Sequence, residues 1–428
     1  MRRTNRRTAY QREKEPIQFS TSSEDPLAAW RISGIKGPVF EQWYFDSVAA
    51  DSKSGITMIF ARDASYAMLG QGHLRMEFDI TFPDGKHFNH ADWMSEAALE
   101  ETDCDVIDGV NGNGSGDGRN DSKKNAGQIK GVWTGPRKLY THTIAADGSS
   151  ARVDLDGPEI QGWYTLTSTA PPHYPHGESH PVRVSGEGAS NGHASTQICP
   201  KIHYVEVIPT AVFEADLVVQ GRPLRFKGIG GHVHIWAAGS WFDTVRGWRV
   251  CRAVVGPWSV TCNEFTSQED GKTYTSGYVA RDGRKEFGAL VERGSVESGA
   301  GDPKENEHQG GTVVKWKPTY ETGIAGPFQD KSTGCILYLK SGENGEEWRF
   351  ELAHKHVAFD VAFGGGDSGL TGFLSGASGG KVGEQVYSGV GNTNVNVLPQ
   401  GWRKIYFFIC MLLSKLSLGY INILGNNT

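Results

Sequence analysis

Short segments in which apolar and polar residues alternate follow one another along most of the chain, and Gly, Pro, Asn or Asp residues separate them. A period of two is typical of strands with one buried face, so residues 39–48, 56–62 and 74–82 are predicted strands. Residues 83–85, Pro-Asp-Gly, predict the turn of a hairpin. Only residues 93–101 show the period of a helix. The pattern therefore predicts an all-β protein.

The alternation begins again after Ile208-Pro209. Residues 212–219 and 224–229 are predicted to form a hairpin around the turn 220–223, and further strands follow. A chain of 428 residues is long enough for two domains of roughly 200 residues each. We therefore expect two consecutive all-β units, each a sandwich or a barrel, with a boundary near residue 210.

The two ends of the chain differ in polarity. Residues 1–25 are polar and charged, which predicts a flexible tail. Residues 405–424 are apolar over about the length of a membrane span, yet Lys415 and Asn422 interrupt them. We expect residues 399–428 to be an apolar extension of unknown role. A C-terminal membrane anchor is the alternative.

The charges and the cysteines limit the classes of function. The formal net charge is -6, and the one basic cluster, Arg2-Arg3 with Arg6-Arg7, lies near the N-terminus, so nucleic acid is not an expected partner. The six cysteines have no metal-ligand spacing, and no apolar signal segment follows the basic start. A reducing, cytoplasmic location is the expectation.

A carboxylate lies inside the aromatic run of residues 40–46, Phe-Glu-Gln-Trp-Tyr-Phe-Asp. Strand alternation places Glu41, Trp43 and Phe45 on one face. A carboxyl on an apolar face must find a hydrogen-bond partner or contact a ligand in a cavity. Glu41 is therefore either a paired structural residue or part of a functional site.

Three tryptophans and two histidines occur together in residues 228–248, a stretch that glycines interrupt. Gly lets the backbone approach a ligand and Trp provides broad flat walls, so this stretch predicts a cavity at the junction of the two units. A tightly packed junction is the alternative. The pairs His232/His234 and His354/His356 could meet as four imidazoles around a metal, although no carboxylate at a ligand spacing completes either pair.

Trp348 and Lys355 lie in and beside a charged cluster that begins at residue 346. Charged residues beside a strand end are typical of a solvated edge. The functional interpretation is that both side chains reach the same cavity as Glu41, where a cationic donor could polarise a carbonyl.

Three segments together resemble one family. Residues 40–46, residues 227–232 (Lys-Gly-Ile-Gly-Gly-His) followed by Trp236, and Trp258-Ser259-Val260 after a Gly-Pro pair are similar to the fungal Diels-Alderases of polyketide and polyketide-peptide pathways. That family is related to the carotenoid hydratases of hydroxyneurosporene-synthase type. The resemblance covers about residues 25–390.

The resemblance implies an all-β fold with an N-terminal β-sandwich, residues 26–210, followed by a C-terminal lipocalin-like β-barrel, residues 211–398, and a substrate cavity between them. It implies a pericyclase that needs no cofactor and catalyses an intramolecular [4+2] cycloaddition. The substrate would be a linear polyene polyketide from a polyketide synthase fused to a peptide synthetase. The product would contain a decalin or, in the cytochalasan branch, an isoindolone.

The resemblance also implies which residues contact the substrate. Glu41 matches a carboxyl position that contacts the polar head, and Trp236 matches the Trp of the family motif His-Asp-x-Asn-Trp-Gly. Val233 stands where that motif has Asp, which argues against hydration, because a hydratase needs an acid to protonate an alkene. The expected catalytic residues are Glu41, Trp236 and Lys355, with Glu41 as a polar anchor. The expected substrate-binding residues are Trp43, Tyr66, Trp241 and Trp348.

Two other functions stay open from the sequence. One is a non-catalytic, lipocalin-like carrier of a hydrophobic metabolite, and the other is a metalloenzyme built on the histidine pairs. The favoured interpretation has no metal and no cofactor, and its expected partner is a small molecule.

Overall fold

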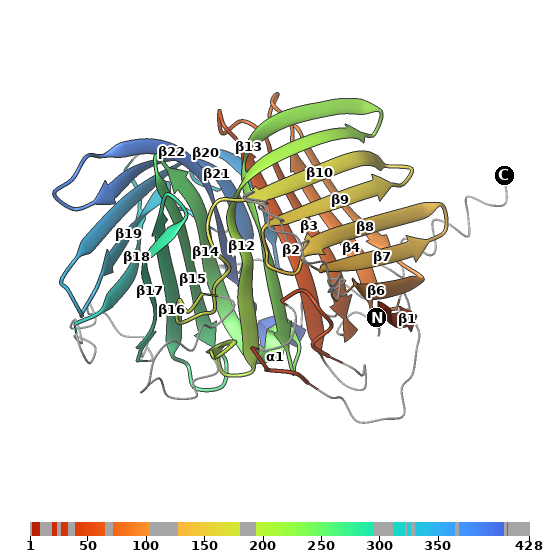
Figure 1. Ribbon diagram of the computed structural model, residues 1–428, viewed down its shortest axis with the longest axis horizontal. Helices are drawn as coiled ribbons and strands as arrows, with labels where there is room; N and C mark the ends of the chain where they lie inside the picture. Colours follow the sequence, from red (N-terminus) through yellow and green to blue (C-terminus); the bar gives the residue numbers. More distant parts are fainter. Residues whose placement is uncertain are drawn as a thin grey trace, which may run out of the picture.

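Strands make up nearly all of the regular structure (Figure 1), as the alternating pattern predicted. The structure is a computed structural model that describes residues 2–8, 19–23, 27–32, 39–64, 72–102, 127–179, 194–294, 311–321, 323–326, 330–363, 368–405 and 409. Two antiparallel sheets lie side by side in Figure 1, and the second follows the first along the chain. The predicted all-β class is confirmed.

The first sheet, called the sandwich sheet below, has 13 strands in the order β1-β6-β7-β8-β9-β10-β12-β13-β2-β3-β4-β5, with β11 paired to β12. Its strands are β1 Arg2–Thr8, β2 Phe40–Ala49, β3 Gly55–Asp63, β4 Leu74–Thr81, β5 His87–Trp93, β6 Glu96–Thr102, β7 Gln128–Gly135, β8 Lys138–Ala145, β9 Ser150–Asp156, β10 Ile160–Ser168, β11 Gln197–Cys199, β12 Ile202–Val219 and β13 Arg222–Ala237.

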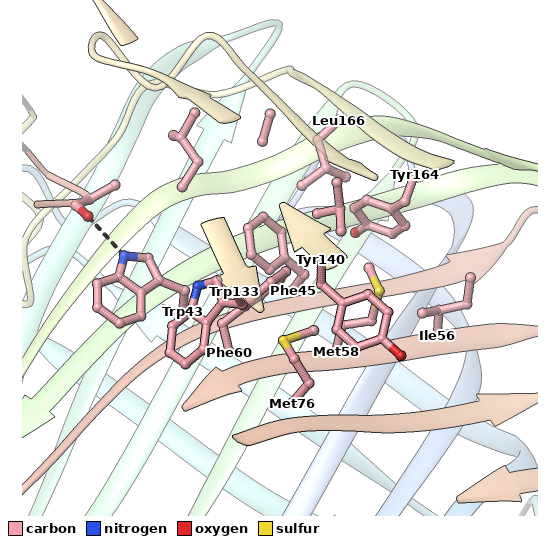
Figure 2. Close-up of a cluster of buried hydrophobic side chains, with 14 of the residues drawn as sticks. Trp43, Phe45, Ile56, Met58, Phe60, Met76, Trp133, Tyr140, Tyr164 and Leu166 are labelled. Carbon is pink, nitrogen blue, oxygen red and sulfur yellow. Dashed lines mark hydrogen bonds between the residues drawn. The ribbon is translucent and has the colours of Figure 1, made fainter. Parts of the chain in front are cut away.

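The sandwich sheet folds over so that β2–β4 pack against β7–β10 around one apolar core. Figure 2 shows side chains from both layers packed together. The ring of Trp133 lies 6.2 Å from that of Trp43 and 5.7 Å from that of Phe60, and all three side chains are buried. Burying large aromatic surfaces is the main source of stability in such a core. The predicted N-terminal sandwich is confirmed.

The second sheet, called the barrel sheet below, has nine strands in the order β17-β16-β15-β14-β22-β21-β20-β19-β18 and curls into a nearly closed, lipocalin-like barrel. A short helix, α1 (Trp241–Thr244), precedes it. Its strands are β14 Val245–Val255, β15 Trp258–Ser267, β16 Thr273–Arg281, β17 Arg284–Arg293, β18 Val313–Thr319, β19 Gly334–Lys340, β20 Glu347–Ala362, β21 Gly369–Lys381 and β22 Tyr387–Val397.

The two sheets meet through a small set of strands. Strands β2, β4, β5, β11, β12 and β13 of the sandwich sheet contact β14, β15, β16, β20 and β22 of the barrel sheet. Strand β2 therefore has the sandwich core on one face and the barrel on the other, which explains why nine of its ten positions are buried. This two-sided burial determines which side chains reach the cavity.

Three predictions about local structure need correction. Residues 93–101 are not helical, because Ala97 and Leu99 are buried in strand β6 while their neighbours face outward. Strand β12 runs through residue 210, and the chain passes from the sandwich sheet to the barrel sheet at residues 238–244 instead. Residues 2–8 are not part of a flexible tail, because they pair with β6. The division into two domains stays a prediction.

The predicted hairpin at residues 83–85 is confirmed. The Phe82 amide donates to the Lys86 carbonyl across the turn at 2.8 Å, and Gly85 adopts a φ of +77°, which glycine reaches without strain. At the C-terminal end, most of the predicted apolar extension lies outside the described residues. Among the helices that the structure describes, none is long and apolar enough to cross a membrane.

Candidate active site

A cavity of about 200 Å³ lies between the two sheets. Strands β2, β3, β4, β12 and β13 line one side, and α1, β14, β15, β20, β21 and β22 line the other. Pockets at such junctions are the usual place for small-molecule sites. The predicted cavity at the junction is therefore present.

Aromatic rings line one part of the cavity and are called the aromatic wall below: Trp241, Phe242, Trp248, Phe265, Phe359 and Phe363. The rings of Trp241 and Trp248 lie 4.5 Å apart. The ring of Phe40 stacks on that of Trp241, with 4.1 Å between the ring centres. Helix α1 places Trp241 there, because the Thr244 hydroxyl donates to the Ser240 carbonyl at 2.9 Å and closes the turn. Aromatic rings in contact of this kind form a rigid apolar surface.

Polar side chains line another part of the cavity. The polar end is defined by Tyr44, Thr57, Asp79 and Asn394. The Tyr44 hydroxyl interacts with the side chains of Thr57 and Asn394. Burial, and then the nearby Asp46 carboxylate, raise the pKa of Tyr44, so its hydroxyl stays a neutral hydrogen-bond donor.

Asp79 is a second donor at the polar end. Burial, and then the charge of Glu77, raise the pKa of Asp79 to about 7, although Asn89 donates a hydrogen bond to its carboxylate. A carboxyl with this pKa is partly protonated near neutral pH and can then donate a hydrogen bond.

The raised pKa of Asp79 predicts a pH-dependent gain in stability for Asp79→Asn. A carboxyl whose pKa is higher in the folded state than its usual 3.8 stabilises the fold below pH 4 and loses that contribution as the pH rises through 7. As the pH rises from 4 to 8, the variant should therefore gain up to about 4 kcal/mol relative to the wild type, since each unit of pKa corresponds to about 1.4 kcal/mol. Denaturant unfolding at the two pH values measures the difference. Asp84→Asn, in the exposed hairpin turn, should show no such gain, and a pH-independent Asp79→Asn effect would contradict the raised pKa.

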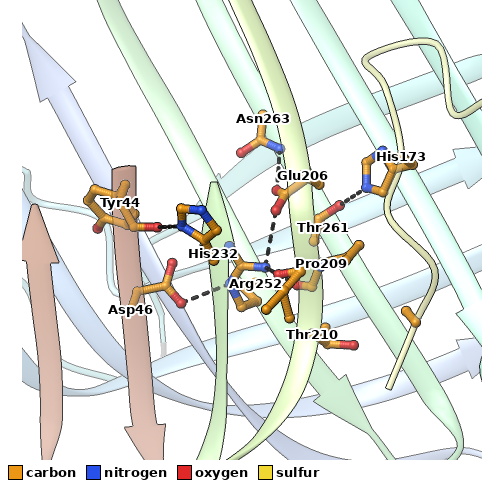
Figure 3. A network of polar contacts seen from close by, with 12 residues as sticks. Tyr44, Asp46, His173, Glu206, Pro209, Thr210, His232, Arg252, Thr261 and Asn263 are labelled. Carbon is orange, nitrogen blue, oxygen red and sulfur yellow. Dashed lines mark hydrogen bonds and ion pairs between the residues drawn. The ribbon is translucent and has the colours of Figure 1, made fainter. Parts of the chain in front are cut away.

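A buried ion-pair network joins the two sheets beside the cavity (Figure 3). Arg252 on β14 donates through Nε to Asp46 Oδ1 at 2.8 Å and through Nη1 to Glu206 Oε2 at 3.2 Å. Its Nη1 also donates to the carbonyls of Ile208, at 3.1 Å, and Pro209. The Arg252 side chain is 4 % exposed. Because both carboxylates belong to the sandwich sheet and Arg252 belongs to the barrel sheet, this arginine connects the two sheets where all three residues line the cavity.

Glu206 is held by several donors at once. Tyr204 donates to Glu206 Oε1, and Asn263 Nδ2 donates to the same oxygen at 3.2 Å. Burial raises the pKa of Glu206, and the Arg252 guanidinium opposes that rise. A buried charge is tolerated only with partners such as these.

Glu41 and Trp43 lie on the opposite face of β2 from the cavity. Alternation puts both on one face, as predicted, but this is the sandwich side, while Tyr44 and Asp46 face the cavity. Glu41 Oε1 accepts from the Arg31 amide at 2.6 Å and lies 3.1 Å from His234 Nε2. Glu41 therefore has the contacts of a paired core carboxylate, and the prediction that it meets the substrate in the cavity needs correction.

Trp236 also packs in the sandwich core. Its Nε1 donates to the Ser20 carbonyl at 2.9 Å, and the Arg31 guanidinium lies 4.9 Å above its ring. The side chain is buried and does not line the cavity. The structure thus brings Glu41, Trp43 and Trp236 together, as a core cluster beside residues 19–23 and 27–32.

The remaining predicted residues lie in different places. Trp241 lines the cavity, as predicted. Trp348 is buried inside the barrel, 5.5 Å from the ring of Phe287, and Lys355 is exposed on β20, so neither side chain reaches the cavity. Tyr66 lies outside the described residues. Catalytic or binding roles for these side chains stay predictions.

The two His-x-His pairs do not meet. His232 Nδ1 donates to the Tyr44 carbonyl, His234 lies against Glu41, and His354 Nε2 contacts the Thr393 hydroxyl. The part of the chain that the structure describes contains no group of three or more His, Cys, Asp or Glu side chains arranged to hold a metal ion.

The sequence interpretation missed a row of carboxamides in the cavity. Asn392, Asn394 and Asn396 line it from β22. Residues 392–396, Asn-Thr-Asn-Val-Asn, put the three side chains on one face of a strand. Because Asn is unfavourable in strands, this pattern could have marked the site.

Comparisons with known proteins agree with this architecture. A model of the Diels-Alderase-like family matches residues 3–399. The Diels-Alderase ucsH of an Acremonium species is 54 % identical over the full length of both chains, and the Diels-Alderase phmD of Phaeosphaeria nodorum is 29 % identical over 90 % of this chain and 96 % of its own. The crystal structure of CghA with Sch210972 has the same fold, with a TM-score of 0.71 and 21 % identity over 94 % of this chain and 99 % of CghA. The chain is therefore an enzyme, a pericyclase that belongs to the Diels-Alderase-like family.

Proposed function

We propose that this pericyclase folds and cyclises a linear polyene polyketide by an intramolecular [4+2] cycloaddition in the cavity between the two sheets. The observation that carries the proposal is the combination of an aromatic wall with a polar end in one cavity. The wall suits a polyene, and the polar end suits an oxygen- or nitrogen-bearing head group. Such a substrate is made by a polyketide synthase fused to a peptide synthetase, and a decalin or an isoindolone is the expected ring system.

Positioning supplies most of the proposed rate acceleration. The reaction forms two carbon–carbon bonds within one chain, so it needs the diene and the dienophile close together rather than a base or a nucleophile. Trp241 and Trp248, whose rings contact each other, would exclude extended conformers of the polyene. The Arg252 network would hold the two sides of the cavity at a fixed separation.

A hydrogen bond to the dienophile carbonyl would lower the barrier further. Tyr44 is the residue we propose for this role, because its hydroxyl lines the cavity and stays protonated. This assignment replaces Glu41, whose carboxylate lies on the other face of β2.

Tyr44→Phe should lower turnover of the linear precursor by about 10-fold, less than the loss of an oxyanion donor, because less charge develops in a cycloaddition. The measurement is consumption of the precursor by purified protein, followed by chromatography beside a protein-free reaction. Tyr274→Phe is the matched control. The Tyr274 hydroxyl donates to Asp270 Oδ2 at 2.7 Å, and Tyr274 does not line the cavity. Its turnover should equal that of the wild type.

The same assay separates the enzyme from a carrier. A carrier would bind the polyene in this cavity without changing the rate or the product distribution from those of the protein-free reaction. That result would overturn the proposed cycloaddition, and unchanged turnover in Tyr44→Phe would overturn only the role of Tyr44.

A further inference from the structure

The mechanism above uses Asn394 only as a part of the polar end beside Tyr44, and it gives Asn392 and Asn396 no role. We propose that Asn396, assisted by Asn394, binds a hydrogen-bond donor on the substrate, so that the head group of the polyene carries an N–H or O–H. This inference rests on the proposed function, because it places the polyene in the same cavity.

Strand β22 is well suited to hold these side chains rigidly. It pairs with β14 on one side and β21 on the other, so Asn396 lies opposite Trp248 and opposite Leu370. The backbone hydrogen bonds of β22 are used in these two ladders. Its side chains are therefore the polar groups that β22 offers to the cavity.

Asn396 is buried without a partner for its carbonyl. The residue is 3 % exposed, and neither its Oδ1 nor that of Asn394 accepts a hydrogen bond from any residue that the structure describes. A buried acceptor without a donor costs about 1–3 kcal/mol. Most buried polar groups avoid that loss, so an exception that lines a cavity indicates a ligand donor.

The surroundings of Asn396 make an internal donor scarce. Its strand neighbours Trp248 and Leu370 also line the cavity, as does Leu398 two residues along the chain. Asn394 lies at the polar end beside Tyr44, whose hydroxyl is the proposed donor to the substrate carbonyl. A head group with a carbonyl next to an N–H or O–H would satisfy both sides of this arrangement.

A pair of polyene amides tests the inference directly. Parinaramide, the primary amide of a conjugated C18 tetraene, has two N–H donors, whereas its N,N-dimethyl derivative keeps the polyene and the carbonyl but has none. Fluorescence titration gives a Kd for each, and the ratio of the two Kd values reports donor recognition. Asn396→Leu should raise the Kd of the primary amide about 10-fold relative to that of the N,N-dimethyl amide, because only the primary amide donates to Asn396.

Two further variants make the result decisive. Asn396→Asp keeps an acceptor oxygen at the same place and should keep the wild-type ratio. Asn344→Leu, in an exposed turn where its Nδ2 donates to Glu346, should leave both Kd values unchanged.

The outcomes separate this inference from the proposed function. If both amides bind and folded Asn396→Leu keeps the wild-type ratio, the donor site is overturned while the polyene cavity stands. If Asn396→Leu does not fold, Asn396→Asp provides the test. Loss of the wild-type ratio of Kd values in Asn396→Asp then overturns the inference as well. If the wild type binds neither amide, the polyene cavity itself is overturned.

Discussion

Arg252→Leu is expected to lower the free energy of unfolding by about 3–5 kcal/mol. The substitution leaves Asp46 and Glu206 buried without the cation that both face, and it also removes donors from two backbone carbonyls. Uncompensated buried charge is among the most destabilising changes that a point substitution can make. Denaturant unfolding at neutral pH measures the loss.

The control for this prediction is an exposed ion pair. Arg152 and Asp154 are each about half exposed, so Arg152→Leu should change stability by about 1 kcal/mol or less. Arg252→Lys should recover only part of the loss, because one ammonium cannot reproduce the fork that spans both carboxylates. If Arg252→Leu were as stable as the wild type, the network would not connect the sheets as described.

The strands and the hairpin were predictable because they depend on local alternation. Residues 83–85 carry the turn chemistry in three adjacent positions, and the preceding strand β4, Leu-Arg-Met-Glu-Phe-Asp-Ile-Thr, alternates apolar and polar residues. The helix predicted at 93–101 failed for a related reason. Two short strands that meet at a turn, β5 and β6, interrupt the period of two and leave a spacing close to that of a helix.

The active site was harder to predict because both faces of β2 are buried. Alternation correctly put Glu41 and Trp43 on one face, but it cannot tell a core face from a cavity face when neither is exposed to solvent. The aromatic residues around Glu41 drew attention to the core. The alternate positions, Tyr44 and Asp46, line the cavity, but no local pattern distinguishes them from core positions.

The ion-pair network and the carboxamide row depend on long-range pairing. Arg252 meets Asp46 from 206 positions along the chain, and no local pattern links them. The aromatic stretch at 228–248 was interpreted correctly in part, since Trp241 and Trp248 reach the cavity, whereas Trp236 turns into the core. Trp236 lies on β13, where alternation places it opposite the cavity-lining Val233 and Ile235, whereas Trp241 belongs to α1 and Trp248 to β14.

Trp241→Ala is expected to reduce turnover of the linear precursor by about 10- to 100-fold and to broaden its product stereochemistry. Removing the indole, which stacks on Phe40 and contacts the tilted ring of Trp248, opens the aromatic wall, so the polyene can adopt conformers that do not react or that present the wrong face. Because Trp241 is only partly buried, the fold should lose much less than with a core tryptophan. Turnover and diastereomer ratio by chromatography, together with unfolding curves, measure the two effects.

Trp236→Ala separates the cavity wall from the sandwich core. Its side chain is fully buried, so truncation should lower the free energy of unfolding by about 3–5 kcal/mol. At a temperature where Trp236→Ala remains folded, its diastereomer ratio should match the wild type, because the ring does not line the cavity. If Trp236→Ala altered the stereochemistry and Trp241→Ala did not, the substrate would lie on the sandwich side of β13. Trp236 would then contact the substrate, as the sequence predicted, and the cavity between the sheets would not be the active site.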